Sequence, residues 1–136
     1  MKSLKTLIKL HKKKLDDLVK EINNLEEKKS AHEAKLKKLQ AEILVELKKY
    51  LGTEYAFMLD NYIKSAEDRE HKLKEQIKGF EEQIAVLRTE LAEQFAELKK
   101  FEIALQNRIN AEKEVERQAE VKDLDEFNSI KYNKNK

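Results

Sequence analysis

The chain has 136 residues, of which 41% are Asp, Glu, Lys or Arg, and its formal net charge at pH 7 is +2. It contains no Pro, no Cys, no Trp and only two Gly. This composition is typical of long amphipathic helices, and it excludes a β-rich domain, a disulfide framework and a cysteine-based zinc site.

Apolar residues recur in heptads along the first part of the chain. Ten of the fourteen a and d positions are apolar or Tyr: Leu4, Ile8, Leu15, Leu18, Ile22, Leu25, Leu36, Leu39, Ile43 and Tyr50. The exceptions are His11, Lys29, His32 and Glu46. The spacing predicts a helix over residues 4–51, and we interpret the two histidines as polar residues of its apolar seam that set the register, rather than as a pH switch.

The dipeptide of Gly52 and Thr53 interrupts the heptads. Gly is suited to end one helix in the left-handed conformation, and Thr can cap free N–H groups of the next. The heptad count restarts after this turn and predicts a second helix over residues 54–125. Gly79 falls at an outward c position of that helix, where it costs about 1 kcal/mol of helix propensity without interrupting the seam.

Two amphipathic helices joined by so short a turn must pack antiparallel, so the predicted fold class is all-α, a long two-helix antiparallel coiled-coil hairpin. We expect one domain over residues 1–127 and a disordered basic tail over residues 128–136. Two registers remain open. One pairs Leu25 with Ile84 and is favoured on burial, whereas the other is shifted by one heptad. In both, the last 20 or so residues of the second helix overhang the first helix without a partner.

The sequence contains no motif for catalysis or metal binding. No two of the three histidines are one helical turn apart, and there is no glycine-rich phosphate loop, so we expect no enzyme, no metal and no cofactor. Residues 2–20 hold seven Lys against two Asp, but the remaining chain nearly cancels that excess. We therefore expect no nucleic-acid partner and at most weak membrane-surface contact. The chain lacks a membrane span and a signal peptide, which favours a soluble cytoplasmic protein.

Large apolar side chains off the seam crowd the predicted turn: Leu44, Val45, Leu47, Leu51, Tyr55, Phe57, Met58 and Tyr62. A two-helix coil buries only a narrow stripe, so several of these must face solvent or a partner. Two interpretations stay open. The side chains either close the hairpin tip around Gly52 or form a docking patch for another protein.

Three segments resemble the FliJ/YscO family of flagellar and injectisome export proteins. They are the leucine-spaced opening at residues 4–10, the element Asn61, Tyr62 and Ile63 that leads into the second helix, and the charged ending at residues 122–127, with Asp125, Glu126 and Phe127. The likeness spans nearly the whole chain. It implies a stalk that inserts its paired termini into the hexameric ring of the export ATPase and couples that ring to the cytoplasmic domain of the export gate.

The resemblance also implies contact with substrate chaperones and a cytoplasmic location beside the inner-membrane export apparatus. Tyr62 matches an aromatic residue of the family's gate-binding face, and Leu39 matches an apolar residue across from it, whereas Glu42 and Glu46 stand where aromatic residues are expected. The candidate partner-binding residues are Leu39, Tyr55, Phe57, Tyr62, Asp125, Glu126 and Phe127. The alternative function is a generic coiled-coil scaffold whose overhang pairs with a second copy.

Overall fold

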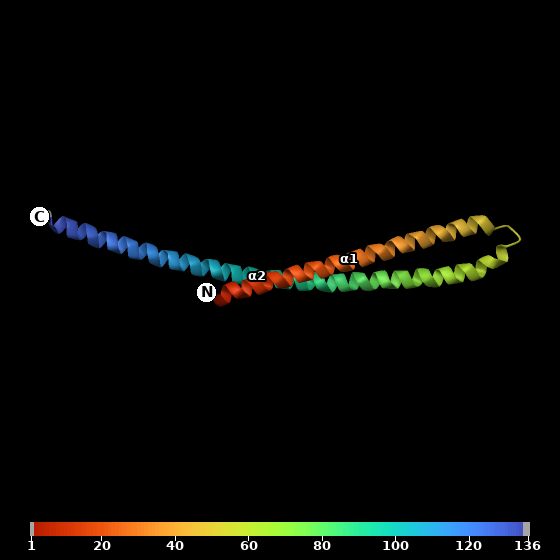
Figure 1. Ribbon diagram of the computed structural model, residues 1–136, viewed down its shortest axis with the longest axis horizontal. Coiled ribbons are helices and arrows are strands. Elements are labelled where there is room, and N and C mark those ends of the chain that lie inside the picture. Colours follow the sequence, from red (N-terminus) through yellow and green to blue (C-terminus); the bar gives the residue numbers. More distant parts are fainter. Residues whose placement is uncertain (1, 135–136) are drawn as a thin grey trace. The chain divides into compact units, whose positions relative to one another are not determined.

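The computed structural model describes residues 2–134, and those residues are almost entirely helical (Figure 1). Helix α1 covers Lys2–Tyr50, a short 3-10 helix η1 covers Ala56–Met58, and α2 covers Leu59–Lys134. The two long helices pack against each other as an antiparallel coiled-coil hairpin. The predicted fold class is therefore confirmed.

Contacts group the chain into two compact units. One unit is Lys14–Glu93, which contains the turn, and we call it the turn unit. The other consists of the described parts of Met1–Lys13 and Gln94–Lys136, and we call it the end unit. Both units draw on α1 and α2, because each helix is continuous through its whole length.

The heptad seam forms the core of the turn unit. Every a and d residue from position 15 to position 91 is buried or half-buried. Ile22, Leu25 and Ile84 make a buried cluster, against which Phe80, Leu87 and Leu91 pack. Leu25 and Ile84 belong to one cluster, so the turn unit adopts the favoured register rather than the one shifted by a heptad.

The turn between the helices depends on one glycine and one threonine. Gly52 has a φ of +80°, the left-handed conformation that glycine adopts at little cost after a helix. The Thr53 hydroxyl donates a 2.6 Å hydrogen bond to the carbonyl of Tyr50 and accepts a 3.3 Å bond from the backbone N–H of Tyr55. The predicted helical start at residue 54 is wrong. Residues 56–58 form η1, and α2 begins at Leu59, the first buried residue after the turn.

The end unit has a smaller seam. Ile8 and Leu98 are buried, and the Nδ1 of His11 makes a 2.9 Å hydrogen bond to the side-chain oxygen of Gln94. The His11 ring also lies 5.1 Å from the ring of Phe101. In this unit the packing of α1 against α2 therefore combines buried apolar residues with the polar pair of His11 and Gln94 in the same seam.

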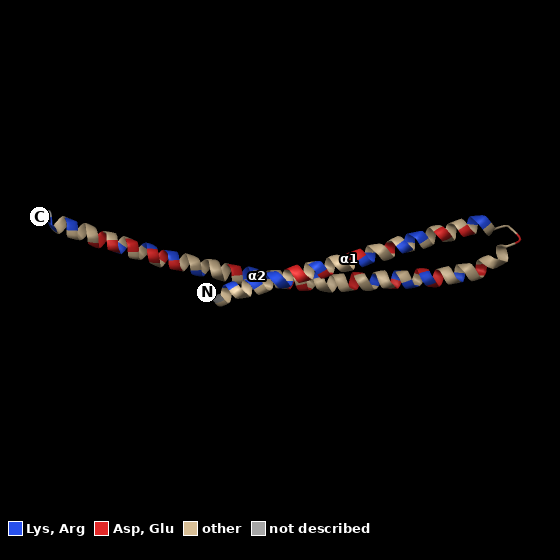
Figure 2. Cartoon of the chain, viewed as in Figure 1, with Lys and Arg blue, Asp and Glu red and all other residues tan. Residues whose placement is uncertain are grey.

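Helix α2 continues beyond this seam for residues 110–134, and all of these residues are exposed. The predicted end of the helix at residue 125 is wrong, and the expected disordered tail is helical over residues 128–134. Residues 135 and 136 of that expected tail lie outside the described part of the chain. Acidic and basic residues are interleaved along this stretch of α2 (Figure 2). A helix can continue here because it contains no Pro or Gly, and Arg117 pairs with Glu114 three residues before it.

Candidate partner-binding surfaces

The turn unit carries a shallow hollow where α1 ends and α2 begins. We call it the tyrosine hollow, and it is lined by Glu46, Tyr50, Tyr55, Met58, Leu59 and Tyr62. Leu59 is buried at its base, whereas Tyr55 and Met58 are exposed. The residues come from α1, the turn, η1 and the start of α2, so the antiparallel return of the chain is what brings them together.

Aromatic contacts order the rim of the tyrosine hollow. The rings of Tyr50 and Tyr55 meet edge to face, with centroids 6.4 Å apart, and the Lys49 ammonium lies 5.3 Å from the Tyr50 ring centroid. Tyrosine offers an apolar body and a polar tip, and such residues are common anchors at protein interfaces. With the half-buried carboxylate of Glu46, the hollow is suited to an apolar side chain that carries a hydrogen-bond donor.

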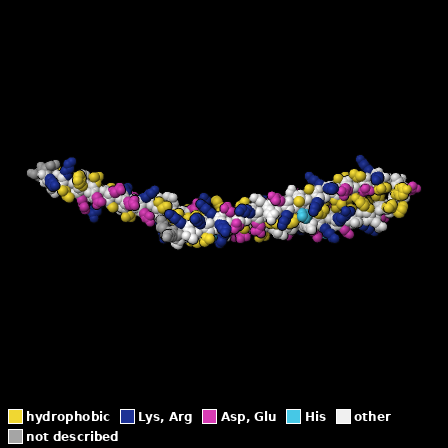
Figure 3. All heavy atoms as spheres, in the orientation of Figure 1, with side chains coloured by type: hydrophobic (Ala, Val, Ile, Leu, Met, Phe, Trp, Pro, Cys, Tyr) yellow, Lys and Arg dark blue, Asp and Glu magenta, His cyan; other side chains and the backbone are white. Residues whose placement is uncertain are grey.

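The apolar patch predicted at the turn divides into packed and exposed members. Leu47 and Tyr62 are half-buried, so part of the patch packs at the hairpin tip. Phe57 is 76% exposed and does not line the tyrosine hollow. Figure 3 shows apolar side chains gathered at the turn end of the molecule. The structure therefore leaves several large apolar side chains at the turn accessible to a partner.

Leu39 lies elsewhere in the turn unit. Its side chain is only 6% exposed, because it occupies a d position of the seam, and it borders a shallow surface with Leu73 and Arg69. Tyr62 lines the tyrosine hollow instead. The structure does not bring these two predicted residues together, and Leu39 offers a partner little accessible surface.

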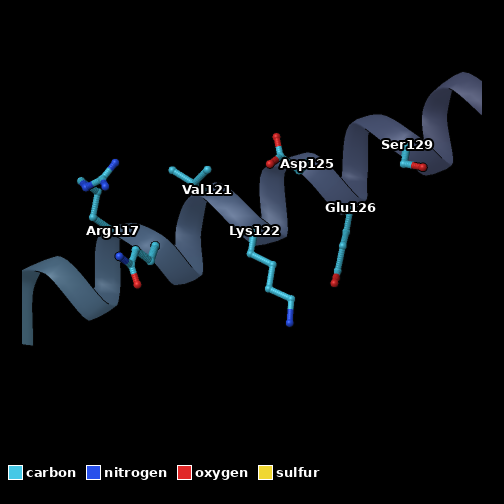
Figure 4. A pocket seen from close by; sticks show the side chains of 7 residues that line it. Arg117, Val121, Lys122, Asp125, Glu126 and Ser129 are labelled. Carbon is cyan, nitrogen blue, oxygen red and sulfur yellow. The ribbon is translucent and has the colours of Figure 1, made fainter.

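Asp125, Glu126 and Phe127 lie in the exposed stretch of α2, which we call the acidic segment, residues 110–134. It carries seven Asp or Glu against five Lys or Arg. Seven residues of this helix border a shallow surface: Arg117, Gln118, Val121, Lys122, Asp125, Glu126 and Ser129. Figure 4 shows Val121 and Asp125 pointing away from Lys122 and Glu126, so these side chains enclose no cavity. The segment is a convex helical surface rather than a pocket.

One ion pair stands out within the acidic segment. Arg117 donates two hydrogen bonds to the Glu114 carboxylate, from Nη2 at 2.7 Å and from Nε at 3.0 Å. This bidentate contact holds the pKa of Glu114 below its usual value and raises that of Arg117. Because both groups are exposed, the pair orders the helix surface but contributes little to stability.

The sequence reasoning missed several exposed apolar residues near the predicted site. Leu124 and Ile130 lie three residues to either side of Phe127, and all three side chains are exposed. Their spacing is detectable in the sequence as a short apolar stripe. It was missed because the predicted helix ends at residue 125, and the stripe has meaning only if the helix continues.

The described residues contain no group of three or more His, Cys, Asp or Glu that could hold a metal ion. Within residues 2–134, neither long helix contains a stretch apolar enough to span a bilayer. The candidate functional surfaces are thus the tyrosine hollow with the exposed residues around it, and the acidic segment.

The whole chain, residues 1–136, matches the family model described as "Flagellar FliJ protein". No curated protein gives a significant match. No solved structure gives one either.

Proposed function

The chain belongs to the FliJ family, whose members are non-catalytic components of the flagellar or type III export apparatus, and from this membership we propose that it acts as the stalk of the export ATPase. In this proposal the acidic segment, together with the start of α1, enters the ATPase ring. The turn end of the hairpin contacts the cytoplasmic domain of the export gate. The protein works beside the inner-membrane export apparatus and also contacts substrate chaperones.

The observation that carries the proposal is the exposure of every residue from 110 to 134 on a continuous helix. A helix whose residues are exposed on every side presents a surface that another protein can contact. Asp125, Glu126 and Phe127 lie in this segment, with Leu124 and Ile130 adding apolar surface. These residues supply both charges and apolar anchors for a ring that contacts the helix from several sides.

The gate-binding part of the proposal is supported by the turn unit. Tyr55 and Tyr62 line the tyrosine hollow, and Phe57 is exposed beside it. These residues form an aromatic surface at the turn of the turn unit. Leu39 contributes through the seam that holds this region, because it is buried.

The test is a truncation that removes Asn110 to Lys136, assayed with the export ATPase of the same cell. Because every residue from 110 to 134 is exposed, the truncated chain should keep the thermal unfolding midpoint of the hairpin by circular dichroism. It should lose the stimulation of ATP hydrolysis that the full chain provides. Full stimulation by the truncated chain would contradict the proposed role.

Point variants refine the same test. Phe127→Ala should weaken stimulation by truncating an exposed apolar anchor, whereas Val86→Ala, at an exposed c position of the turn unit, serves as the matched control and should not. Equal loss in both variants would indicate a general defect rather than a contact with the ring.

The exposed segment also favours a second candidate, a scaffold in which it pairs with another copy of the chain. Light scattering separates the two functions. A mass near the 16.1 kDa of one chain supports the stalk, whereas a stable dimer or tetramer supports the scaffold.

A further inference from the structure

The outward face of α1 near the turn contains no carboxylate. Heptad positions b, c and f point away from the seam, and between residues 30 and 51 they hold only small, apolar and basic residues: Ser30, Ala31, Ala34, Lys37, Lys38, Ala41, Leu44, Val45, Lys48 and Leu51. All ten are exposed, and Leu44 and Leu51 are 64% and 69% exposed. We call this surface the outer face of α1.

The rest of the turn unit differs from this face in composition. The same three heptad positions contain Asp16, Asp17 and Glu27 earlier in α1. They contain Asp68, Glu75 and Glu82 in α2. In the rest of the turn unit these three heptad positions together carry both signs of charge, whereas the outer face of α1 carries no acid.

Ala and Val hold four of the six c and f positions of this face, and these positions repeat at helical-interface spacing. Positions c and f run through Ala31, Ala34, Lys38, Ala41, Val45 and Lys48, in alternating steps of three and four residues. This is the spacing with which one helix lies along another, and the three alanines let a second backbone approach closely. At the turn end, Leu44, Val45, Leu47, Lys48 and Leu51 line a shallow surface hollow that could receive a large side chain.

We propose that the outer face of α1 docks an amphipathic helix of another protein, with its apolar stripe against the alanine and leucine positions and acidic residues on its flanks. Lys37, Lys38 and Lys48 supply the complementary charge on the face. Two acidic residues lie at its edges, Glu33 and Glu42, and Glu33 lies 3.8 Å from the Lys29 ammonium. The fit combines apolar packing on the alanine and leucine positions with charge from the three lysines.

A helix suits this surface better than a lipid bilayer does. The stripe is narrow and mostly alanine before residue 44, so it would bury little apolar area in a membrane, and it contains no aromatic residue. The same narrow stripe matches the contact that two helices make. This inference goes beyond the proposed stalk function, because it assigns a surface that neither the ATPase ring nor the tyrosine hollow uses.

The experiment measures binding of a synthetic amphipathic peptide of about three heptads, with Leu at a and d and Glu at e and g, to the full chain by fluorescence anisotropy. The matched probe replaces each Glu with Lys. We expect the acidic peptide to bind about tenfold or more tightly than the basic one, and we expect that affinity to fall as salt is raised from about 0.05 M to about 0.5 M.

The chain offers matched variants for this assay. Leu44→Glu with Leu51→Glu should weaken binding of the acidic peptide about tenfold or more, because the apolar anchors are lost and acids are added. Lys38→Glu with Lys48→Glu should act in the same direction, and Val86→Glu on α2 should change the affinity by less than about twofold. All of these side chains are exposed, so the helical circular-dichroism signal should stay unchanged.

Failure of the acidic peptide to bind, equal binding of both peptides, or equal effects of the outer-face and Val86 variants would overturn the proposal. Two other results would overturn it by naming a different occupant. Association with anionic vesicles that is lost in the Leu44 and Leu51 variant would assign the face to lipid. A concentration-dependent mass increase that is lost in the same variant would assign it to a second copy. None of these assays uses the export ATPase, so they do not test the proposed stalk function.

Discussion

At the scale of single residues, the polar members of the seam are explained by what each contacts. The Lys29 ammonium lies 3.5 Å from Glu81 on α2. The His32 Nδ1–H donates a 2.8 Å hydrogen bond to the carbonyl of Lys28, and its ring meets Phe80 edge to face at 5.0 Å. Half-buried polar groups are tolerated where they find such partners, and they favour one alignment of the helices over its neighbours.

Gly79 provides a prediction at the same scale. A Cβ added there would meet no atom within 4 Å, and φ at this position is ordinary for a helix. Gly79→Ala should therefore raise the free energy of unfolding by about 0.5–1 kcal/mol, because Ala loses less backbone entropy on helix formation. Urea unfolding followed by circular dichroism measures this. The matched comparison is Gly52→Ala, which should destabilise the chain because φ there is +80°. A destabilised Gly79→Ala would show that this position is crowded.

At the scale of helices, contacts between α1 and α2 select the register. The Arg88 guanidinium lies 2.9 Å from the Glu26 carboxylate, and the Gln40 amide donates a 3.2 Å hydrogen bond to Glu70. A shift by one heptad would keep the apolar seam filled but would separate these polar pairs by about 10 Å of helix. Each of these exposed polar pairs contributes little free energy by itself. The register is selected because the polar pairs and the apolar packing are satisfied in the same alignment of the two helices.

The pKa of Glu70 depends on this register, because Gln40 on the opposite helix is hydrogen-bonded to its carboxylate. Its pKa is lowered first by the hydrogen bond from Gln40 on the opposite helix and then by the hydrogen bond from Lys74. Because the folded-state pKa lies below the unfolded value, this carboxylate stabilises the fold above its ordinary pKa, and that stabilisation is lost as the pH falls through the folded pKa. A carboxyl NMR titration should find the Glu70 pKa below its usual value of 4.5.

The variant that tests this link is Gln40→Leu, which should move the Glu70 pKa upward toward its ordinary value. Lys74→Met should move it in the same direction, because Lys74 lowers this pKa both by its hydrogen bond and by its charge. An unchanged Glu70 pKa in the Gln40 variant would mean that the two helices are not aligned at this point as described.

At the scale of the whole molecule, FliJ-family membership makes this chain a part of an export apparatus, and the structure separates residues that hold the hairpin from residues available to partners. Seam residues such as Leu25 and Ile84 are buried, whereas Phe57 and Phe127 are exposed. The exposed aromatic residues are therefore free to serve binding without a large cost to folding.

The double variant Phe57→Ala with Tyr62→Ala tests this separation. Phe57 is exposed and Tyr62 is half-buried, so the helical circular-dichroism signal should remain nearly intact. Binding to the cytoplasmic domain of the export gate, measured by calorimetry, should weaken about tenfold or more. Loss of most helicity would show instead that these two rings hold the hairpin tip together.

The sequence by itself determined which faces of the helices are buried and where the chain turns. A seven-residue apolar period allows only one stripe to pack, and Gly52 is the one residue of its stretch suited to a positive φ. Only the tertiary structure decided the register, because a shift of one heptad leaves the apolar pattern unchanged. It also set the start of α2 at Leu59, because the turn at Thr53 and the 3-10 helix η1 come directly before it. Leu39 is buried in the seam, whereas Phe57 is exposed. The register, the start of α2 and the burial of Leu39 depend on which residues of the opposite helix lie close by. The order of residues along the chain does not contain that information.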